Sequence, residues 1–373
     1  MSDRIARAAL SRLSEPGDVR LSTLVARLGA VKVYELLRDE QDIAGVFTDV
    51  ADRLRALDPQ RDLDRAAAAG IRFVCPGDAE WPTALYDLDR VEPLQGRGGS
   101  PLGLWAKGPL SLADACARAV AVVGSRSATS YGANVASDLA AALGSEGVCV
   151  VSGAAFGIDQ AAHRGALAAT GPTVAVLACG VDRAYPSAHK NLLDYIADVG
   201  LVISELPPGC APTRYRFLSR NRVIAALAQG TVVVEAAVRS GALNTANWAT
   251  RLNRVLMGVP GPVTSAPSEG VHELIRRQEA ALVTRGADVL ELVSPAGSFL
   301  AHAARGPDRP RDGLTERERR VLDAVPARQP ASGASIARTA GLAAGDVVAV
   351  LGRMRSAGFV QEVDGRWSLS RDA

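Results

Sequence analysis

The 373-residue sequence predicts an α/β fold: a Rossmann-like, doubly wound parallel sheet flanked by an N-terminal helical part and a C-terminal winged helix. Three observations predict it. Apolar runs of four to six residues alternate with helix-like segments between Ala119 and Pro260. Those runs are continuously apolar, as strands buried on both faces require. A stretch rich in proline and glycine then precedes a helix-turn-helix pattern.

Each apolar run has the length of a strand, and each following segment has the length and polar start of a helix. Because the two alternate, we expect parallel strands with helices on both faces of the sheet. The expected strands are Ala119–Val123, Val148–Val151, Thr173–Ala178, Leu201–Ser204, Thr231–Glu235 and Val255–Val259. The expected helices are Tyr131–Leu143, Asp159–Ala168, His189–Ala197, Ser219–Ala228 and Thr245–Arg254.

The parts on either side of the sheet have different patterns. In residues 1–70, Leu21, Leu24 and Leu28 recur at helical spacing, which predicts a small helical domain before the sheet domain of residues 71–293. Residues 294–313 have the composition of a linker. Residues 314–373 are predicted to form a winged helix, with a capping box at Thr315 and Glu318, helices over 335–340 and 345–357, and a hairpin turn at Asp364-Gly365.

The composition is that of a folded globular protein, with 48% apolar and 22% charged residues and a formal net charge of only +2. Since the molecule is not a polycation, any nucleic-acid site must be local. Lysine occurs three times, so nearly all of the 42 positive side chains are arginine. Arginine suits bidentate phosphate contacts, although a biased genomic composition is the simpler reason for the overall count.

Several classes of protein are not indicated. Five widely spaced cysteines and four histidines have neither a disulfide framework nor metal-ligand spacing, and the GxGxxG and GxxxxGK[ST] motifs are absent, so we expect no metal and no cofactor. The charged N-terminus lacks the apolar part of a secretory signal, and no apolar run approaches the roughly 20 residues of a membrane helix. These features predict a cytoplasmic protein without membrane contact.

Small, hydroxyl-bearing turns follow three of the expected strands, where helix N-termini offer N–H groups to anions. In the second turn, Asp159 is expected to cap the next helix. Because carboxyl ends of parallel strands meet at one edge of a sheet, the turns should converge on one phosphate-binding rim. Their candidate residues are Gly124, Ser125, Arg126, Ser152, Gly153, Ser240, Gly241 and Thr245.

The segment between Pro212 and Arg222 places four arginines and two aromatics within eleven positions. Arginines neutralise phosphates, and an aromatic face stacks on an unpaired base. The two together favour single strands over closed duplex. Phe217 alone fits a core side chain better than a stacking platform, but its coincidence with the turns on one edge favours a binding site. The candidate residues in this segment are Arg214, Phe217, Arg220, Asn221 and Arg222.

Motifs in the same order and spacing resemble the DNA-processing protein A (DprA/Smf) family over about residues 70–293. The flanking parts are similar to accessory domains of many members, which implies a SAM/HhH-like helical domain for residues 1–70 and a winged helix at the C-terminal end. The motifs are Val122-Val-Gly-Ser-Arg126, Val151-Ser-Gly, Gly157-Ile-Asp159, Ala162-His163, Gly165-Ala-Leu167, Ser204-Glu205, Phe217, Arg220-Asn-Arg222, Glu235-Ala, Ser240-Gly241-Ala-Leu and Val259-Pro-Gly261.

The resemblance implies a non-catalytic homodimer that binds single-stranded DNA, protects incoming strands and helps to load RecA recombinase during natural transformation and homologous recombination. It implies DNA contacts for Arg126, Arg214 and Phe217. Two departures from the family pattern matter: Phe156 replaces a basic residue, and the segment after Gly270 is atypical. The latter segment helps to form the dimer and RecA surfaces in relatives, which makes Leu274 and Ile275 candidates for that surface.

Two other functions stay open at this point. The chain could be a hydrolase of a nucleotide-derived ligand that uses Glu235, although it lacks the Pro-Gly-Gly-x-Gly-Thr-x-x-Glu motif of phosphoribohydrolases. Ser152, Asp159 and His163 are too scattered to form a convincing catalytic set, which favours a protein that is not an enzyme. The third function is a ligand-sensing regulator whose winged helix reads duplex DNA. The expected recognition helix, residues 345–357, has few basic residues, so we expect weak duplex binding.

Overall fold

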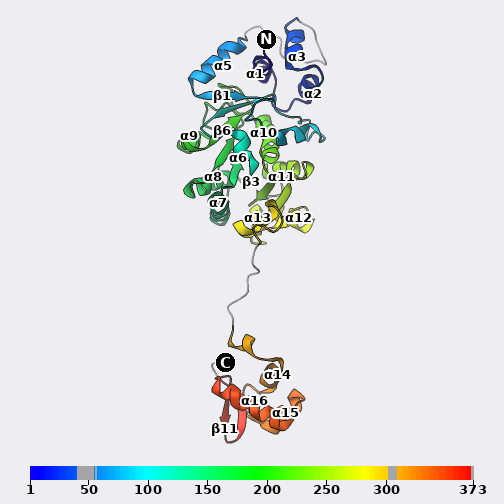
Figure 1. Cartoon of the computed structure of the whole chain (residues 1–373), viewed down its shortest axis with the longest axis vertical. Coiled ribbons are helices and arrows are strands. Elements are labelled where there is room, and N and C mark those ends of the chain that lie inside the picture. Colours follow the sequence, from blue (N-terminus) through cyan, green and yellow to red (C-terminus); the bar gives the residue numbers. More distant parts are fainter. Residues whose placement is uncertain (40–53, 55–56, 301–308, 371–373) are drawn as a thin grey trace. The chain divides into compact units, whose positions relative to one another are not determined.

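The computed structural model describes residues 1–39, 54, 57–300 and 309–370 (Figure 1). The chain forms two compact units, Met1–Ala301 and His302–Ala373, and each has a hydrophobic core of its own. A large parallel sheet in the first unit confirms the α/β, Rossmann-like fold that the sequence predicts.

The first unit contains a nine-stranded sheet with helices before, within and after it. Its strands are β1 (Ile71–Val74), β2 (Leu104–Lys107), β3 (Ala119–Val123), β4 (Cys149–Ser152), β5 (Thr173–Val176), β6 (Leu201–Ser204), β7 (Gly230–Val233), β8 (Val255–Gly258) and β9 (Ala281–Leu282). Its α-helices are α1 (Asp3–Leu13), α2 (Val19–Leu28), α3 (Ala30–Arg38), α5 (Pro59–Ala68), α6 (Leu112–Ala117), α7 (Ser130–Ser145), α8 (Ile158–Ala168), α9 (Lys190–Val199), α10 (Arg214–Leu227), α11 (Ala242–Arg251), α12 (Glu269–Arg276) and α13 (Gly286–Val293).

The strand order is β1-β2-β6-β5-β4-β3-β7-β8-β9. From β6 to β9 in that order the strands pair in parallel, and β1 and β2 add an antiparallel edge. The chain runs from β3 outward to β6 and then returns to the other side of β3 at β7. Such a reversal of strand order creates the crevice in which open α/β sheets bind ligands.

Side chains of β3 alternate between two cores. Ala121 and Val123 belong to the core that α10 and α11 share, whereas Val120 and Val122 belong to the core beneath α7 and α8. The two helix pairs accordingly lie on opposite sides of β3 (Figure 1). This arrangement explains why the strands are continuously apolar.

All six expected strands are present, with ends within two residues of the prediction. The largest difference concerns α10, which begins at Arg214 rather than at Ser219. A second difference is the start of α8, where Gly157, with a φ of 77°, takes the cap position that the sequence assigns to Asp159. Asp159 is instead a buried residue in the first turn.

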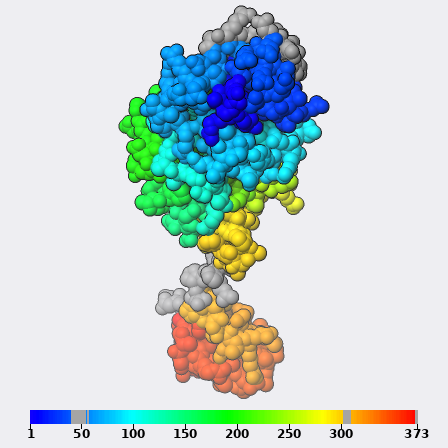
Figure 2. Space-filling model, turned by 45° about the horizontal axis from the view of Figure 1, so that its top comes forward, coloured from blue at the N-terminus to red at the C-terminus, as the bar shows by residue number. Residues whose placement is uncertain are grey.

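The N-terminal helices pack on the antiparallel edge of the sheet. Arg4 donates a hydrogen bond to the carbonyl of Phe73, and Arg12 donates one to the carbonyl of Pro208 at 3.2 Å. Figure 2 shows the blue N-terminal helices in contact with the light-blue segment that leads into β1. Since these helices and the sheet belong to one compact unit, a domain boundary near residue 70 stays a prediction.

The second unit has the elements that the sequence predicts for it. Thr315 and Glu318 form the capping box of the first helix, and Gly341 ends the next helix in the left-handed conformation. Asp364 and Gly365, both with positive φ, make the hairpin turn. The elements are α14 (Glu316–Ala324), β10 (Ala331–Ser332), α15 (Gly333–Ala340), α16 (Ala344–Ser356), β11 (Val360–Val363) and β12 (Arg366–Leu369).

The five cysteines are free thiols. Within the described residues, no group of three or more histidine, cysteine, aspartate or glutamate side chains could hold a metal ion. Over the same residues, no single helix is long and apolar enough to cross a membrane; α15 and α16 meet the criteria only as a pair that is bent by 107°.

The contact between α7 and α8 gives a prediction for Gly165. A glycine inside a helix normally costs stability relative to alanine. Here a Cβ would lie 2.1 Å from the backbone oxygen of Ser137, so Gly165→Ala should destabilise the protein by about 1–3 kcal/mol, measured by urea unfolding. Gly352 in α16 has open space around it, so Gly352→Ala should stabilise that helix in amide hydrogen exchange. A higher unfolding midpoint for Gly165→Ala would contradict the close packing of the two helices.

Candidate nucleic-acid interface

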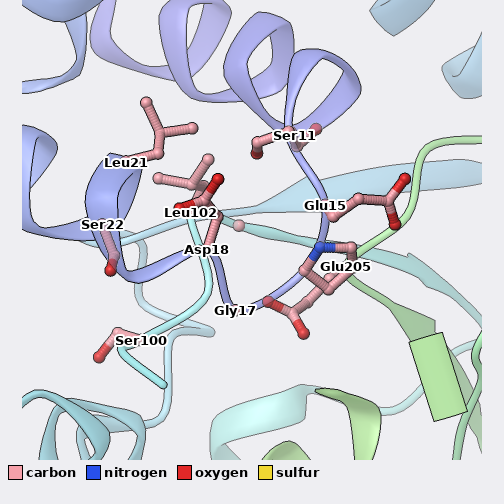
Figure 3. A pocket seen from close by; sticks show the side chains of 12 residues that line it. Ser11, Glu15, Gly17, Asp18, Leu21, Ser22, Ser100, Leu102 and Glu205 are labelled. Atoms are coloured by element: carbon pink, nitrogen blue, oxygen red, sulfur yellow. The ribbon is translucent and has the colours of Figure 1, made fainter. Parts of the chain in front are cut away.

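A groove with a volume of about 1060 Å³ lies at the carboxyl edge of the sheet, beside the reversal of strand order. Loops after β3, β4, β5 and β7 and the first turns of α10 and α11 form its walls. A second hollow, between the N-terminal helices and Glu205, has a volume of about 20 Å³, enough for about one water molecule (Figure 3). Of these two cavities, only the groove can take a larger ligand.

Ten of the thirteen residues predicted to bind nucleic acid line this groove. They come from three separate segments of the chain, which the sheet brings to one edge. They are Gly124, Ser125 and Arg126 after β3, Arg214, Phe217, Arg220 and Asn221 on α10, and Ser240, Gly241 and Thr245 after β7.

The turn after β3 contributes its positive charge through a side chain. The Ser125 N–H already donates a hydrogen bond to the Glu235 carbonyl at 2.7 Å, so this N–H is not available to a ligand. The exposed side chain of Arg126 lines the groove beside it. The expected anion site at this turn therefore depends on the guanidinium of Arg126.

Helix α10 presents two of the predicted side chains because it starts earlier than expected. The Thr213 hydroxyl accepts a hydrogen bond from the Arg216 N–H at 3.4 Å and caps the helix. Helical spacing then places Arg214 and Phe217 on the same face, which lines the groove. The positive charges of arginines in a first turn interact unfavourably with the positive end of the helix dipole. A bound phosphate would therefore stabilise this end of the helix.

Phe217 is half-buried and is surrounded by cations and a second ring. The Arg126 guanidinium carbon lies 4.6 Å from the Phe217 ring centroid, and that of Arg220 lies 6.0 Å from it. The Tyr185 ring centroid lies 5.4 Å away at an interplanar angle of 49°. The groove thus combines the two chemistries that single strands need, phosphate neutralisation and base stacking.

Arg220 is a fixed charge in the groove wall. Its side chain is only 6% exposed, donates a hydrogen bond to the Val176 carbonyl at 2.9 Å, and has an Nε–H without a partner among the described atoms. Burial lowers the pKa of Arg220 to about 10, so it stays protonated at neutral pH. Burial also raises the pKa of Asp159, against the opposing influence of Arg220.

Three predicted site residues do not line the groove. Ser152 is buried and donates a hydrogen bond to the Val122 carbonyl at 2.7 Å. Gly153 provides space: a Cβ there would fall 1.4 Å from Nη1 of Arg220, so a larger residue would displace that guanidinium. Ser152 and Gly153 therefore support the groove from beneath instead of facing a ligand.

Arg222 is the third of these residues, and its role is structural. Its guanidinium forms a bidentate ion pair with Glu205 at 2.5 and 2.6 Å and also donates to the carbonyls of Gly99 and Ser219. Close by, Glu15 forms a bidentate ion pair with Arg216 at 2.7 and 2.8 Å. Glu15 and Glu205 both line the small hollow of Figure 3, so two ion pairs hold α10 beside this hollow.

The turn after β7 is joined to α10 by an amide. Asn221 Nδ2 donates hydrogen bonds to the Gly241 carbonyl and to Asn244 Oδ1, both at 3.3 Å. Thr245 is buried at the start of α11. These contacts fix the distance between two walls of the groove.

Several residues that line the groove are not among those predicted from the sequence. Tyr185 lies nine residues after the end of β5, too far from a strand end for the position to indicate the site. Arg239 directly precedes the predicted turn at Ser240 and Gly241, and this position could have identified it as a residue of the site. The other groove residues of this kind include Gln95, Asn244 and Asn247.

Arginines of the first unit differ in whether a carboxylate pairs with them. Arg216, Arg222 and Arg254 are in ion pairs with carboxylates. Among the residues that the structure describes, no carboxylate forms an ion pair with Arg126 or Arg214. The groove is therefore a local excess of positive charge in a chain of net charge +2.

The predicted partner surface on α12 is not supported at Leu274. This residue is 8% exposed and belongs to the core beneath α12, and half-buried Ile275 packs against the same core. Leu274 and Ile275 are candidates because the family resemblance assigns this segment to partner surfaces, and a resemblance does not show which face of this short helix packs on β8. The exposed residues Arg276 and Arg277 both pair with Glu273.

The Arg222–Glu205 pair yields a prediction. Arg222→Ala would leave Glu205 buried without its partner and should destabilise the protein by about 3–5 kcal/mol in urea unfolding. Arg214→Ala, on the exposed end of the same helix, should change stability by less than about 0.5 kcal/mol. If Arg222→Ala unfolds like the wild type, the assignment of a structural role to Arg222 is wrong.

His163 gives a prediction about pH. Burial lowers the pKa of His163 to about 3, whereas in the unfolded chain it is about 6.5. As the pH falls, His163 is therefore protonated in the unfolded chain before it is protonated in the folded one. The contribution of His163 to the free energy of unfolding is fully present above pH 6.5 and decreases as the pH falls towards 3. The unfolding midpoint of His163→Gln should therefore fall less between pH 7 and pH 4 than that of the wild type, and parallel curves would contradict this assignment.

Comparison with known proteins identifies the family. Residues 72–294 match the family model for DNA recombination-mediator protein A. A Mycobacterium tuberculosis (strain H37Rv) protein assigned as a DNA processing protein DprA is 45% identical over 100% of this chain and 96% of its own length. The DNA processing protein DprA of Streptococcus pneumoniae (strain R6) is 44% identical over 51% of this chain and 66% of its own length.

Solved structures agree with this match. The X-ray structure of DNA processing protein A from Streptococcus pneumoniae is 30% identical and has a TM-score of 0.65 over 79% of this chain and 99% of that one. A structure of the Helicobacter pylori protein, which concerns its single-stranded DNA binding mode, is 26% identical with a TM-score of 0.50 over 59% of this chain and 94% of that one. The chain therefore belongs to the DNA recombination-mediator protein A (DprA/Smf) family of DNA-processing proteins.

Proposed function

We propose that this chain binds single-stranded DNA in the groove, protects incoming strands and loads RecA recombinase on them during natural transformation and homologous recombination. The observation that carries the proposal is the meeting of Arg126, Arg214, Arg220 and Phe217 in one groove at the switch point of the sheet. The Helicobacter pylori relative, whose structure concerns single-stranded DNA binding, supports the same ligand.

The chemistry of the groove favours an unpaired strand. Arginines without carboxylate partners attract phosphates, and this attraction weakens as salt increases because counterions are released from the nucleic acid. The aromatic rings can stack only on bases that are free of a partner strand. A closed duplex would meet the arginines and leave the rings unused.

The proposal includes a homodimer and action in the cytoplasm, as the family resemblance implies. It also includes a contact with RecA. Since Leu274 packs inward, a partner that approached α12 would meet the charged residues Glu273, Arg276 and Arg277.

We further infer that the groove acts by binding, without turnover. Glu235, the carboxylate that the hydrolase alternative requires, is 1% exposed and accepts hydrogen bonds from the Thr129 N–H at 2.9 Å and its hydroxyl at 2.5 Å. This carboxylate stabilises the start of α7. Asp159 and His163 are buried as well, which favours structural roles for all three.

The regulator alternative receives little support from the second unit. The basic residues of α16 are engaged locally, because Arg353 pairs with Glu318 and Arg355 pairs with Glu362. A duplex-reading helix needs free side chains at base edges. We therefore expect weak duplex binding by this unit.

The proposal is tested by fluorescence anisotropy with labelled oligo-dT and the matching duplex across a salt series. Wild-type protein should prefer the single strand. Arg126→Ala should weaken this binding about tenfold and reduce the slope of log affinity against log salt by about 0.7. Arg118, an exposed arginine that precedes β3 at the opposite edge of the sheet, is the matched control, and Arg118→Ala should bind as the wild type does. Equal binding by wild type and Arg126→Ala would place the DNA elsewhere, and no binding by the wild type at low salt would reject the proposal.

A further inference from the structure

We propose that Tyr185 is a base-stacking residue of the groove and provides the first aromatic surface that an entering base meets. The inference rests on the proposed function, because it names a contact of the same site. Tyr185 belongs to neither the arginine-rich segment nor the turns that the sequence singles out. It lines the groove from the loop after β5.

The argument begins with the surroundings of Phe217. Arg126 lies over the Phe217 ring at 4.6 Å, Arg220 lies 6.0 Å from it, and Tyr185 flanks it at 5.4 Å. A guanidinium at such a distance forms a cation–π contact with the ring. A base could stack on the face that Arg126 covers only after Arg126 had moved away.

Tyr185 offers a surface that needs no such movement. Its side chain is 43% exposed, whereas Phe217 is half-buried on α10. Among the groove-lining residues that the structure describes, Tyr185 and Phe217 are the aromatic ones. The exposed aromatic area of the groove therefore belongs largely to Tyr185.

The loop that carries Tyr185 is fixed on both sides of it. The Asp182 carboxylate accepts hydrogen bonds from the Gly209 N–H at 2.9 and 3.0 Å, which joins the loop to the segment before α10. After Tyr185, the His189 N–H donates to the Pro186 carbonyl at 2.9 Å, and His189 Nδ1 lies 3.0 Å from the Ala154 carbonyl. A ring on a fixed loop loses little conformational freedom when a base stacks on it.

The arrangement also separates phosphates from bases. Arg126 and Arg214, which form no ion pair with the described carboxylates, come from the turn after β3 and from α10, while Tyr185 comes from a different wall of the groove. A strand whose phosphates contact Arg126 and Arg214 can turn a base towards Tyr185. On binding, phosphates would compete with the Phe217 ring for Arg126, which would open Phe217 as a second platform beside the first.

The test uses the full chain and oligo-dT that carries a single 2-aminopurine, a fluorescent base whose emission is quenched by stacking. Wild-type protein should quench the probe. Tyr185→Ala should remove most of this quenching and weaken binding by roughly tenfold, whereas Tyr185→Phe should keep both. Tyr195→Ala is the matched control, because Tyr195 is 53% exposed on α9 and does not line the groove.

Tyr185→Leu serves as a second variant that keeps apolar bulk while removing the aromatic face. It should lose quenching as Tyr185→Ala does, with an unfolding midpoint equal to that of the wild type. Wild-type affinity and quenching in both variants would overturn the role of Tyr185 while leaving the proposed function intact. Absence of binding by the wild-type chain itself would instead remove the proposed function, and the stacking role with it.

Discussion

The ion pair between Arg222 and Glu205 fixes the helix on which the groove depends. It is almost completely buried and bidentate, and it joins α10 to the segment after β6. With Arg222 held on one side of the helix, Arg214 and Phe217 lie on the side that lines the groove. The Glu15–Arg216 pair adds a link to the N-terminal helices. Those helices thereby contribute to the geometry of a site that they do not line.

Arginine has two roles in this chain, and its environment decides between them. Arg222 and Arg216, beside carboxylates, are part of the packing, because a buried charge is tolerated only with a partner. Arg126 and Arg214, which form no ion pair with the described carboxylates, supply the field that attracts an anion. Arg220 is intermediate, since it is buried near Asp159 and retains an Nε–H that has no partner among the described residues. A net charge of +2 thus conceals a strongly basic groove.

In the function that we propose, the groove of this Rossmann-like sheet serves a polymer instead of a small cofactor. The crevice beside β3 is where such sheets bind nucleotides. Here its wall carries arginines from two segments and two aromatic rings, spread over a volume of about 1060 Å³. Glu235, the carboxylate of the hydrolase alternative, accepts hydrogen bonds from Thr129, the N-cap residue of α7, and Asp159, which lines the groove, is buried in the first turn of α8. The arginines and rings of this edge are the features on which the proposed contact along a strand rests.

The sequence by itself determined the fold class, the six central strands and ten of the groove residues, because buried parallel strands are continuously apolar and their carboxyl ends must meet at one edge. It could not separate Arg222 from Arg214, since both are arginines in one basic segment and only packing shows which one meets Glu205. It also left Tyr185 unmarked, and it could not show that Leu274, a candidate for a partner surface through the family resemblance alone, packs inward. Those assignments depend on contacts between segments far apart in the chain, which local pattern and spacing do not contain.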